Sequence, residues 1–337
     1  MSLRALLSHA LLCVLALAFA WRMAHRAEET RGGPTSRVLL EANKGDVVAL
    51  EYRWPRGTAK VTSAGADKDR AVTVELSREI EAAKPKQADV LDAGPPAAVP
   101  PPQREDARFP AGKSVLLGLE ALEPLKTRRT LGDVDAARLQ SMGLTSPERS
   151  LVVTMKNGKQ LVLDVGEASF GGQGRYARVQ GDSVVHLLES VLGTAFEGAP
   201  DAMMEKRVLP VPVEELLGYR ARFGDKEGAY LHRDREQSAL RKFVPKDEPS
   251  STAAEPAKVM TTLRNLRGGK LVADAKLAGS VVASFSVDIV NKQAPVKLEV
   301  RERSDGAGHL ITSGEWTWEL GETQAKELLD DLETLLP

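Results

Sequence analysis

Hydrophobic positions form one continuous run at the start of the chain and regular spacings after it. The run extends from Ala5 to Met23 and contains no acidic residue. Its length of about 19 residues corresponds to a helix of about 28 Å, just enough for a hydrocarbon core of roughly 30 Å. Trp21, Arg22 and Arg26 lie at its end, where an indole beside arginine anchors a spanning helix at the headgroups. We therefore predict a membrane anchor over residues 1–26.

A cleaved signal peptide is the alternative for this segment and stays open at this point. Arg4 would form the basic region, Leu11–Phe19 the apolar region and Ala18-Phe19-Ala20 the cleavage motif. Charge does not fix the orientation, because the excess of arginine after the run has little effect on a long following domain. Cys13, the single cysteine, lies inside the run, so the body has no thiol, as in an exported protein without disulfides.

A polar tether over residues 27–37 leads into segments with the alternation of strands. VVALEYRW, from Val47 to Trp54, is followed by a proline-glycine turn and TAKVT, and AVTVEL, from Ala71 to Leu76, has a period of two residues. Clustered proline removes backbone donors and is incompatible with a helix interior. The Pro-rich insert 82–110, which contains DAGPPAAVPPP, is therefore expected to be a mobile or polyproline-like excursion.

Two short helices and a hairpin are expected after the insert. DVDAARLQSM is expected to begin at the N-cap Asp133 and to stop at Gly143. SLVVTMKNGKQLVLDV, from Ser150 to Val165, predicts a hairpin with a type I′ turn at Asn157-Gly158. A glycine-hinged strand, GGQGRYARVQGD, and a helix over 183–196 complete this half. The helix KSVLLGLEAL presents four aliphatic residues on one side: Val115, Leu116, Leu119 and Leu122.

The second half of the chain repeats this order of elements. ELLGYRARFGDKEGAYLHRD matches the opening hairpin, AKVMTTLRNLRGGKLVAD the first helix, SFSVDIVNKQAPVKLEVRE the asparagine-turn hairpin, and HLITSGEWTWEL the glycine-turn strand. A polar insert over 245–256 replaces the proline-rich one. The closing helix, Thr323–Leu336, presents leucines to the sheet: Leu328, Leu329, Leu332, Leu335 and Leu336.

The predicted fold class is α+β. It consists of two tandem modules of antiparallel sheet backed by helices, after one N-terminal transmembrane helix. The first module covers residues 38–208 and the second covers residues 209–337. A body of about 310 residues is long enough for two domains of about 150 residues each.

The charge balance excludes one class of partner. The chain has 46 basic and 47 acidic residues, a net charge of −1, so the protein has no overall field that would recruit nucleic acid. No basic stripe alternates with aromatic residues either. We therefore expect no nucleic-acid partner.

The middle of the chain carries a spaced pattern of turns, strands and small residues. It runs G-L-x-x-P, a strand, a small turn, a second strand, a Y-x-R strand and a charged segment, and its positions here are Gly143, Leu144, Pro147, Asn157, Gly158, Gly166, Tyr176 and Arg178. This stretch resembles the domain-of-unknown-function 4340 family. The preceding element of that family, a Trp-containing strand and a proline, is matched here only by Phe109-Pro110.

The resemblance implies a bacterial envelope protein with an N-terminal membrane helix. Proteins of this family are often associated with ABC-transporter-like gliding-motility assemblies, and the family brings no catalytic residues to this sequence. With the apolar run, it leads us to expect a single-pass protein of the bacterial inner membrane with its body in the periplasm. Inner-membrane lipid would contact the N-terminal helix.

Two segments echo nucleotide-binding loops but are better explained structurally. PAGKS, at Pro110–Ser114, lacks the first glycine of a phosphate loop, because Ala107 occupies that position, and proline-rich coil is expected before it. The glycines of GGQGRY lack the third glycine and the following helix of a dinucleotide site, and turn geometry explains them.

Histidines are weak candidates for chemistry. His232, Asp234 and Glu236 would share one strand face and could form a metal triad, but arginines flank them, and an exposed charged face is the ordinary interpretation. His186 lies among apolar positions of a predicted helix, where a partly buried imidazole is expected. We therefore expect no catalytic residue, no metal and no cofactor.

Aromatic residues offer the better candidates for recognition. Trp316 and Trp318 are two apart on a predicted strand and therefore share a face, where they either cover the core or form a platform for a partner. Arg175 and Tyr176, beside flexible glycines, are the other candidates for partner recognition. The expected function is that of a non-enzymatic membrane-anchored scaffold or accessory subunit of a transporter-like or motility-related assembly, with an envelope or membrane protein as partner. The alternative is a periplasmic glycan- or lipid-binding protein or hydrolase that uses a groove between the modules.

Overall fold

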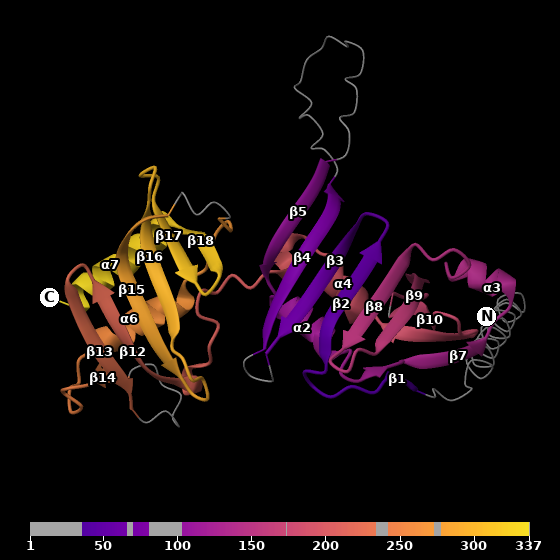
Figure 1. Ribbon diagram of the computed structural model, residues 1–337, viewed down its shortest axis with the longest axis horizontal. Coiled ribbons are helices and arrows are strands. Elements are labelled where there is room, and N and C mark those ends of the chain that lie inside the picture. The colour runs from indigo at the N-terminus through magenta and orange to yellow at the C-terminus, as the bar shows by residue number, and fades with distance from the viewer. Residues whose placement is uncertain are drawn as a thin grey trace, which may run out of the picture. The chain divides into compact units, whose positions relative to one another are not determined.

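A computed structural model describes residues 36–65, 70–80, 103–172, 174–233, 242–272 and 278–336 (Figure 1). It contains a nine-stranded sheet in the order β5-β4-β3-β2-β8-β9-β10-β11-β7, a seven-stranded sheet in the order β14-β13-β12-β15-β16-β17-β18, and the pair β1-β6. The described part of the chain is mostly antiparallel sheet with a smaller share of helix. This agrees with the predicted α+β class.

The strands of the nine-stranded sheet and of the small pair have the following bounds: β1 (Val38–Leu40), β2 (Val47–Trp54), β3 (Gly57–Ala64), β4 (Ala71–Ile80), β5 (Gln103–Pro110), β6 (Leu125–Lys126), β7 (Arg129–Asp133), β8 (Arg149–Met155), β9 (Gln160–Ala168), β10 (Gly174–Val179) and β11 (Val184–Glu189). The remaining strands are β12 (Leu216–Phe223), β13 (Lys226–His232), β14 (Phe243–Pro245), β15 (Ala278–Ile289), β16 (Val296–Arg303), β17 (His309–Ser313) and β18 (Trp316–Leu320). The helices are α2 (Lys113–Glu120), α3 (Ala136–Ser141), α4 (Val191–Phe196), α5 (Pro200–Met203), the 3₁₀ turn η2 (Val213–Glu215), α6 (Glu255–Asn265) and α7 (Glu322–Leu335).

The described residues divide into two compact units. The first holds residues up to 55 together with 119–194, and the second holds 56–118 together with 195–336. The units interleave along the sequence, whereas the predicted modules, 38–208 and 209–337, follow one another. Segment 56–118 groups with later residues because the Gly112 N–H donates to the Met203 carbonyl at 2.6 Å, and the Glu205 N–H donates to the Pro110 carbonyl at 3.0 Å.

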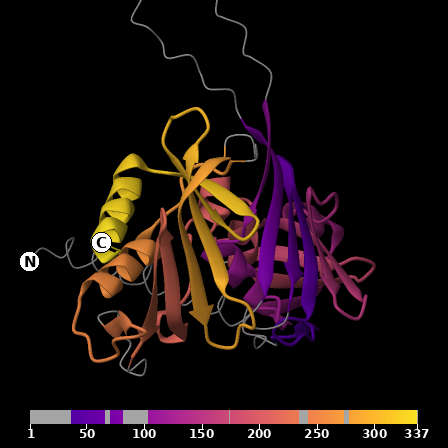
Figure 2. The ribbon, with the colours of Figure 1, turned by 60° about the vertical axis from the view of Figure 1, so that its left-hand side comes forward.

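The seven-stranded sheet is covered on one face by α6 and α7, which lie side by side (Figure 2). Leu328 and Leu332 of α7 are fully buried, Leu336 is nearly so, and Leu329 and Leu335 pack at the edge, as the leucine spacing predicts. The hydroxyl of Thr262 donates to the buried Asp331 at 2.7 Å, and Lys258 pairs with the same carboxylate at 2.7 Å. Among the described residues, the buried core of this sheet comes from residues between Val208 and Leu336. The tandem division at residue 208 stays a prediction.

The predicted helix over 183–196 is wrong in its first half. Residues Val184–Glu189 form strand β11, which pairs with β10 on one side and β7 on the other. Paired neighbours on both edges override the helical spacing of the apolar residues. The Asp182 side chain accepts from the Val184 N–H at 3.2 Å, which starts the strand from a turn. Only Val191–Phe196 is helical.

The expected excursion over 82–110 also ends earlier than predicted. Residues Gln103–Pro110 form strand β5, which pairs along its whole length with β4. The charged alternation QREDARF suits an edge strand, and the single proline stands at the last position. Residues 81–102 lie outside the described part.

Three local predictions can be compared in detail. The hairpin β8–β9 is confirmed, but Gly158 alone has a positive φ, 80°, and its N–H donates to the Met155 carbonyl, so the turn is a type I turn with a glycine bulge instead of type I′. The N-cap of α3 is Asp135, whose carboxylate accepts from the Arg138 N–H at 2.8 Å, because Asp133 ends β7. The stop at Gly143, with φ 68°, is confirmed.

In α2, Val115, Leu119 and the following Leu122 are buried, but Leu116 is exposed.

In the described ranges, no helix combines the length and the hydropathy of a transmembrane span. The predicted anchor over residues 1–26, Cys13 and most of the tether 27–37 lie outside the described residues, as do Asp234 and Glu236. The polar insert 245–256 overlaps structure at both ends. Pro245 ends β14, a strand that the sequence did not predict, and the predicted helix α6 begins at Glu255, slightly before the expected Ala257.

Candidate functional site

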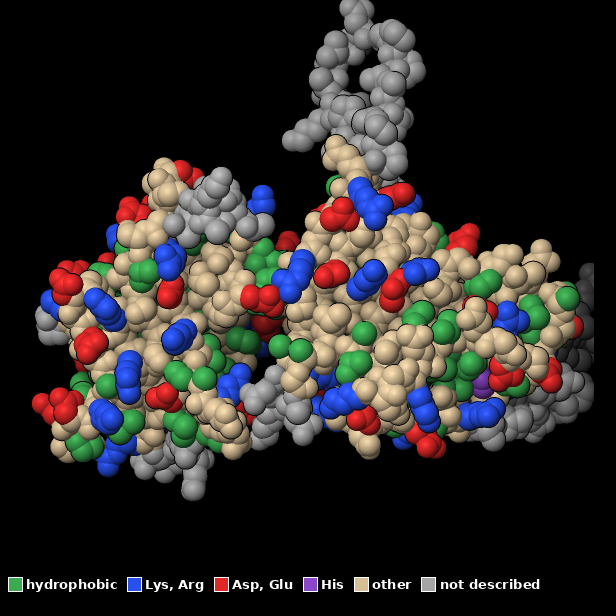
Figure 3. Space-filling view, viewed as in Figure 1, with side chains coloured by type: hydrophobic (Ala, Val, Ile, Leu, Met, Phe, Trp, Pro, Cys, Tyr) green, Lys and Arg blue, Asp and Glu red, His purple; other side chains and the backbone are tan. Residues whose placement is uncertain are grey.

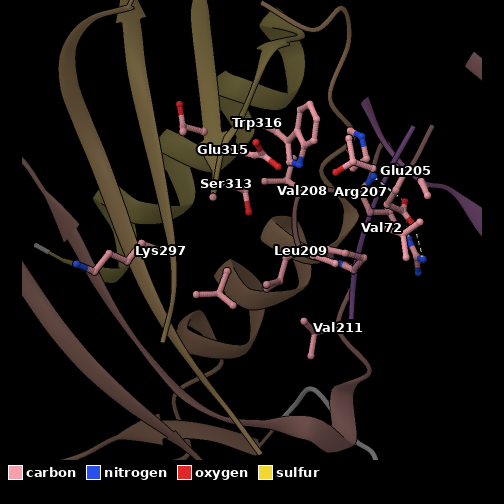
Figure 4. A pocket seen from close by; sticks show the side chains of 18 of the residues that line it. Val72, Glu205, Arg207, Val208, Leu209, Val211, Lys297, Ser313, Glu315 and Trp316 are labelled. Carbon is pink, nitrogen blue, oxygen red and sulfur yellow. Dashed lines mark hydrogen bonds and ion pairs between the residues drawn. The ribbon is translucent and has the colours of Figure 1, made fainter. Parts of the chain in front are cut away.

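A pocket of about 910 Å³ opens within the second unit (Figure 4). Its walls come from β4, the end of β5, the start of α2, the connecting segment Glu205–Val211 and the turns before β16 and between β17 and β18. Its apolar lining includes Val72, Leu116, Val208, Leu209, Val211 and Trp316. Charged residues interrupt this lining, so the pocket is amphipathic.

The connecting segment is held in place by backbone pairing. The Gly268 N–H donates to the Lys206 carbonyl at 2.7 Å, and the Val208 N–H donates to the Leu266 carbonyl at 3.3 Å. Pro210 and Pro212 then keep the chain extended, because proline disfavours a helical residue before it. This arrangement presents the Glu205 and Arg207 side chains to the pocket, to the right of Trp316 in Figure 4.

Glu205 and Arg207 form a closely bonded pair. Arg207 donates from Nη2 and Nε to the two carboxylate oxygens of Glu205 at 2.7 and 3.1 Å, and its backbone N–H donates to the same carboxylate at 2.9 Å. Burial opposes ionisation of Glu205, but these hydrogen bonds and the Arg207 charge outweigh it and hold the pKa of Glu205 below its ordinary value. The Glu205 carboxylate is therefore ionised at neutral pH.

Trp316 stands at the start of β18, beside a second charged pair. The guanidinium of Arg108, on β5, lies 4.9 Å from the centre of the indole, within range of a cation–π interaction. The same guanidinium donates to Glu315 from both terminal nitrogens at 3.1 Å. Arg108 thereby fixes both the indole and the carboxylate at the rim of the pocket.

The pocket's cations outnumber its carboxylates. Its three carboxylates each bond to an arginine, Glu205 to Arg207, Glu315 to Arg108 and Glu299 to Arg301, the last at 2.6 Å. Three further cations line the pocket: Arg70, Lys292 and Lys297. Glu205, whose pKa is lowered, has no proton to give at neutral pH. The arrangement suits binding of an anionic or dipolar group beside an apolar ring better than acid–base chemistry.

The predicted recognition residues lie on two strands of different units. Trp316 lines the pocket and is half-buried, whereas Trp318 is 2% exposed and belongs to the core, with its indole N–H lacking a partner within the described residues. Arg175 and Tyr176 are adjacent on β10, so their side chains point to opposite faces of the sheet. An Arg175 terminal nitrogen lies 3.4 Å from the Gly166 carbonyl.

The weaker candidates have structural roles where they are described. His232 is buried, stacks on Phe243 and bonds through Nδ1 to the Leu216 carbonyl at 3.0 Å. His186 lies in a strand, not a helix, and is fully buried, with Nδ1 3.2 Å from the Thr130 hydroxyl. Among the residues that the structure describes, no three His, Cys, Asp or Glu side chains are grouped so as to hold a metal ion.

The PAGKS segment has no room for a phosphate at its glycine. A Cβ at Gly112 would stand 2.7 Å from the Met204 carbonyl oxygen, and the Gly112 N–H is already bonded to Met203. The Ser114 hydroxyl donates to the Ala202 carbonyl at 2.9 Å. Contact between two chain segments therefore explains this motif.

The sequence did not mark Arg108, Glu205 or Arg207 as candidate site residues. Arg108 fell in the stretch assigned to the proline-rich insert, and its partners are far away along the chain, which no spacing rule could reveal. Glu205 and Arg207 belong to MMEKRVLPV, the charged segment between the two predicted modules. Charged residues next to an extended apolar segment were the only available signal.

The structure defines a mostly antiparallel α+β protein with an amphipathic, cation-rich pocket. On the face shown in Figure 3, basic and acidic side chains are interspersed, so the surface there carries no large patch of one sign. Residues 118–281 match the family described as "Domain of unknown function (DUF4340)". Over that segment, the match confirms the resemblance predicted from the sequence. No curated protein and no solved structure matches the chain.

Proposed function

We propose that this protein is a non-enzymatic accessory subunit of a bacterial envelope assembly, held at the inner membrane by its N-terminal run with its body in the periplasm. The proposal includes a transporter-like or gliding-motility assembly as the partner. Three features support it: the apolar run 5–23, the family resemblance, and a pocket arranged for binding.

One observation carries the proposal. Each carboxylate of the pocket is bonded to an arginine, and the pKa of Glu205 is lowered. A general acid in a hydrolase requires a raised carboxyl pKa, so this pocket favours recognition over hydrolysis. Trp316 provides a large apolar contact with a polar end, the residue type that is enriched at binding hot spots.

Site-specific photocrosslinking of the full chain in its native cells tests this role. A photoreactive amino acid at Trp316 or at Val211, both in the pocket wall, is expected to capture a defined membrane or envelope protein. The matched control is the same amino acid at Leu231, which is exposed on β13 outside the pocket lining. Equal capture from all three positions, or none from the pocket, would overturn the proposal.

The membrane part of the proposal is tested separately. After a carbonate wash of membranes, the full-length protein is expected to stay in the pellet, and a variant without residues 1–26 is expected in the supernatant. Protease added from the periplasmic side is expected to digest the body. Release of the full-length chain by carbonate, or protection of the body, would contradict the proposal.

A periplasmic glycan- or lipid-binding protein is the second candidate. It is favoured by the indole of Trp316 beside the lysine and arginine side chains of the pocket, since sugars stack on aromatic faces and anionic groups pair with lysine and arginine. Titration with a uronic acid would then quench tryptophan fluorescence, and Trp316→Ala would abolish the response while Trp54→Phe would keep it. Unchanged quenching in Trp316→Ala would exclude this candidate for the pocket.

A further inference from the structure

Strand β5 forms one edge of the nine-stranded sheet. It pairs with β4 from Gln103 to Pro110, in a register that places Val74 opposite Phe109 and Arg78 opposite Glu105. In an antiparallel pair, residues alternate between those that bond to the neighbouring strand and those whose backbone groups point away from it. Residues of β5 whose backbone N–H and C=O groups point away from β4 are therefore available to an added strand.

Two hydrogen bonds settle this alternation. The Ala111 N–H donates to the Val72 carbonyl at 2.9 Å, so odd-numbered residues of β5 bond to β4. On the opposite edge, the Pro110 carbonyl accepts from the Glu205 N–H at 3.0 Å, which shows that even-numbered residues point outward. Arg104, Asp106 and Arg108 therefore present their backbone N–H and C=O groups at the open edge.

The edge is covered at one end only. The segment Met203–Glu205 lies along Ala111 and Pro110, and the chain then turns away to pair with residues 266–268. Within the described part of the chain, no strand covers Arg104–Arg108 on this side. An uncovered edge of this length is a template for an added strand.

The side chains on the edge determine which strand fits. Arg104, Asp106 and Arg108 share one face of the sheet and alternate in sign. Charged residues normally protect an edge by repelling a copy of themselves. Here an antiparallel copy centred on Glu105 places Arg104 opposite Asp106 in both halves of the pair, so that opposite charges meet.

Other registers are less suitable. In an antiparallel pair centred on Asp106, the two Asp106 side chains would lie opposite each other, and Arg104 would lie opposite Arg108. Like charges directly opposite each other destabilise the pairing. Centring on Ala107 brings the copy against Pro110, where Glu205 already occupies the edge. In the register centred on Glu105, the two Glu105 side chains meet on the other face, but each already has a counter-ion, Arg78, at 2.6 Å.

We propose that β5 pairs antiparallel with β5 of a second copy of this chain, with Arg104 of each copy opposite Asp106 of the other. The two nine-stranded sheets would join into one continuous sheet across a two-fold axis. This inference goes beyond the proposed accessory function and does not depend on it.

Disulfide trapping of the full-length chain in mild detergent tests the register. In a Cys13→Ser background, Glu105→Cys places two thiols directly opposite across the axis, within reach of a disulfide. Oxidation is expected to convert most of this variant to a covalent dimer. The control Ala107→Cys lies on the same strand face, but its counterpart is Gln103 of the other copy, so little dimer is expected. Equal trapping of both variants, or trapping of neither, would overturn the proposal.

A charge exchange tests the same contact without oxidation. In Asp106→Arg, the new arginine of each copy would face Arg104 of the other copy. This variant is expected to raise the dimer dissociation constant roughly tenfold or more. The double variant Arg104→Asp with Asp106→Arg restores opposite charges and is expected to recover the wild-type mass in light scattering. Both sites are exposed, so folding is expected to persist. A wild-type chain that is monomeric at all concentrations, or a double variant no better than the single one, would refute self-pairing.

Discussion

At the scale of single residues, some of the contacts that shape this protein join side chains that are distant in sequence. Arg108 holds Glu315 and Trp316 across more than two hundred positions, and Thr262 bonds to Asp331 between two helices. The sequence could identify Trp316 as a candidate from its type and spacing. It could not reveal the role of Arg108, because a pair so distant in sequence depends on the fold and not on local spacing.

His186 provides a prediction about pH. Its side chain is fully buried, and burial, with the charge of Arg37, lowers its pKa below the ordinary value of 6.5. The unfolded chain therefore binds a proton more readily than the folded one, so stability is present above about pH 6.5 and is lost as the pH falls below it. His186→Leu is expected to reduce the fall in Tm between about pH 7.5 and pH 5.5. His309→Leu, at a partly exposed strand position, is the control, and an equal effect in both variants would contradict this account.

Tyr219 provides a prediction about a single hydrogen bond. Its hydroxyl donates to the Pro256 carbonyl at 2.7 Å inside the core, and burial raises its pKa well above the ordinary value. Tyr219→Phe leaves that carbonyl without its donor and is expected to lower the free energy of unfolding by about 1–3 kcal/mol. Chemical denaturation measures the change. Tyr176→Phe, at a partly exposed site, should change it much less.

At the scale of elements, the alternation of apolar residues located the strands better than the helices. The strand Val47–Trp54 has the bounds that the pattern predicts. Two expected hairpins of the second half are present as β12–β13 and β15–β16, separated by turns with glycine or asparagine, although β15 begins at Ala278, before the predicted Ser284. Segment 183–196 was assigned wrongly because its apolar residues fit both a helix and a doubly paired strand. Strand β5 was missed because its charged residues carry no apolar signal and its pairing with β4 spans the proline-rich stretch.

Close packing of an element against glycine provides a third prediction. A Cβ at Gly268 would overlap the ring of Trp318, which is buried between the sheet and its helices. Gly268→Ala is expected to displace the indole, lower stability by about 1–3 kcal/mol and shift the tryptophan emission. Gly321→Ala is the matched control, because only the flexible end of Gln324 lies nearby and the φ of −59° suits alanine. A wild-type spectrum and stability in Gly268→Ala would disprove the packing argument.

At the scale of the whole molecule, the sequence predicted the family and the mostly antiparallel α+β character. The two compact units interleave along the sequence, because hydrogen bonds of Pro110 and Gly112 join residues 56–118 to residues after 195, and the predicted tandem division stays a prediction. Local composition does not predict hydrogen bonds between segments so far apart in the sequence. The core, however, is contiguous in sequence, since the buried residues that the structure describes in the seven-stranded sheet's cluster lie between Val208 and Leu336.

That contiguity leads to a fourth prediction. A fragment of residues 205–337 contains the complete core of the seven-stranded sheet and is expected to unfold cooperatively on heating, with a single transition in circular dichroism. A second fragment, 205–320, lacks α7 and with it Leu328 and Leu332, and is expected to show no cooperative transition. A non-cooperative 205–337 fragment would mean that residues 56–118 are needed for folding.

The position of α7 has a consequence for synthesis. Its leucines close the apolar face of a sheet whose strands all precede it in the sequence. As the chain emerges, α6 is available early, but the part of the face that α7 covers therefore remains exposed until residues 322–335 follow. The nascent chain passes through an aggregation-prone interval at that stage, and chaperones that bind exposed aliphatic surface would act on it then.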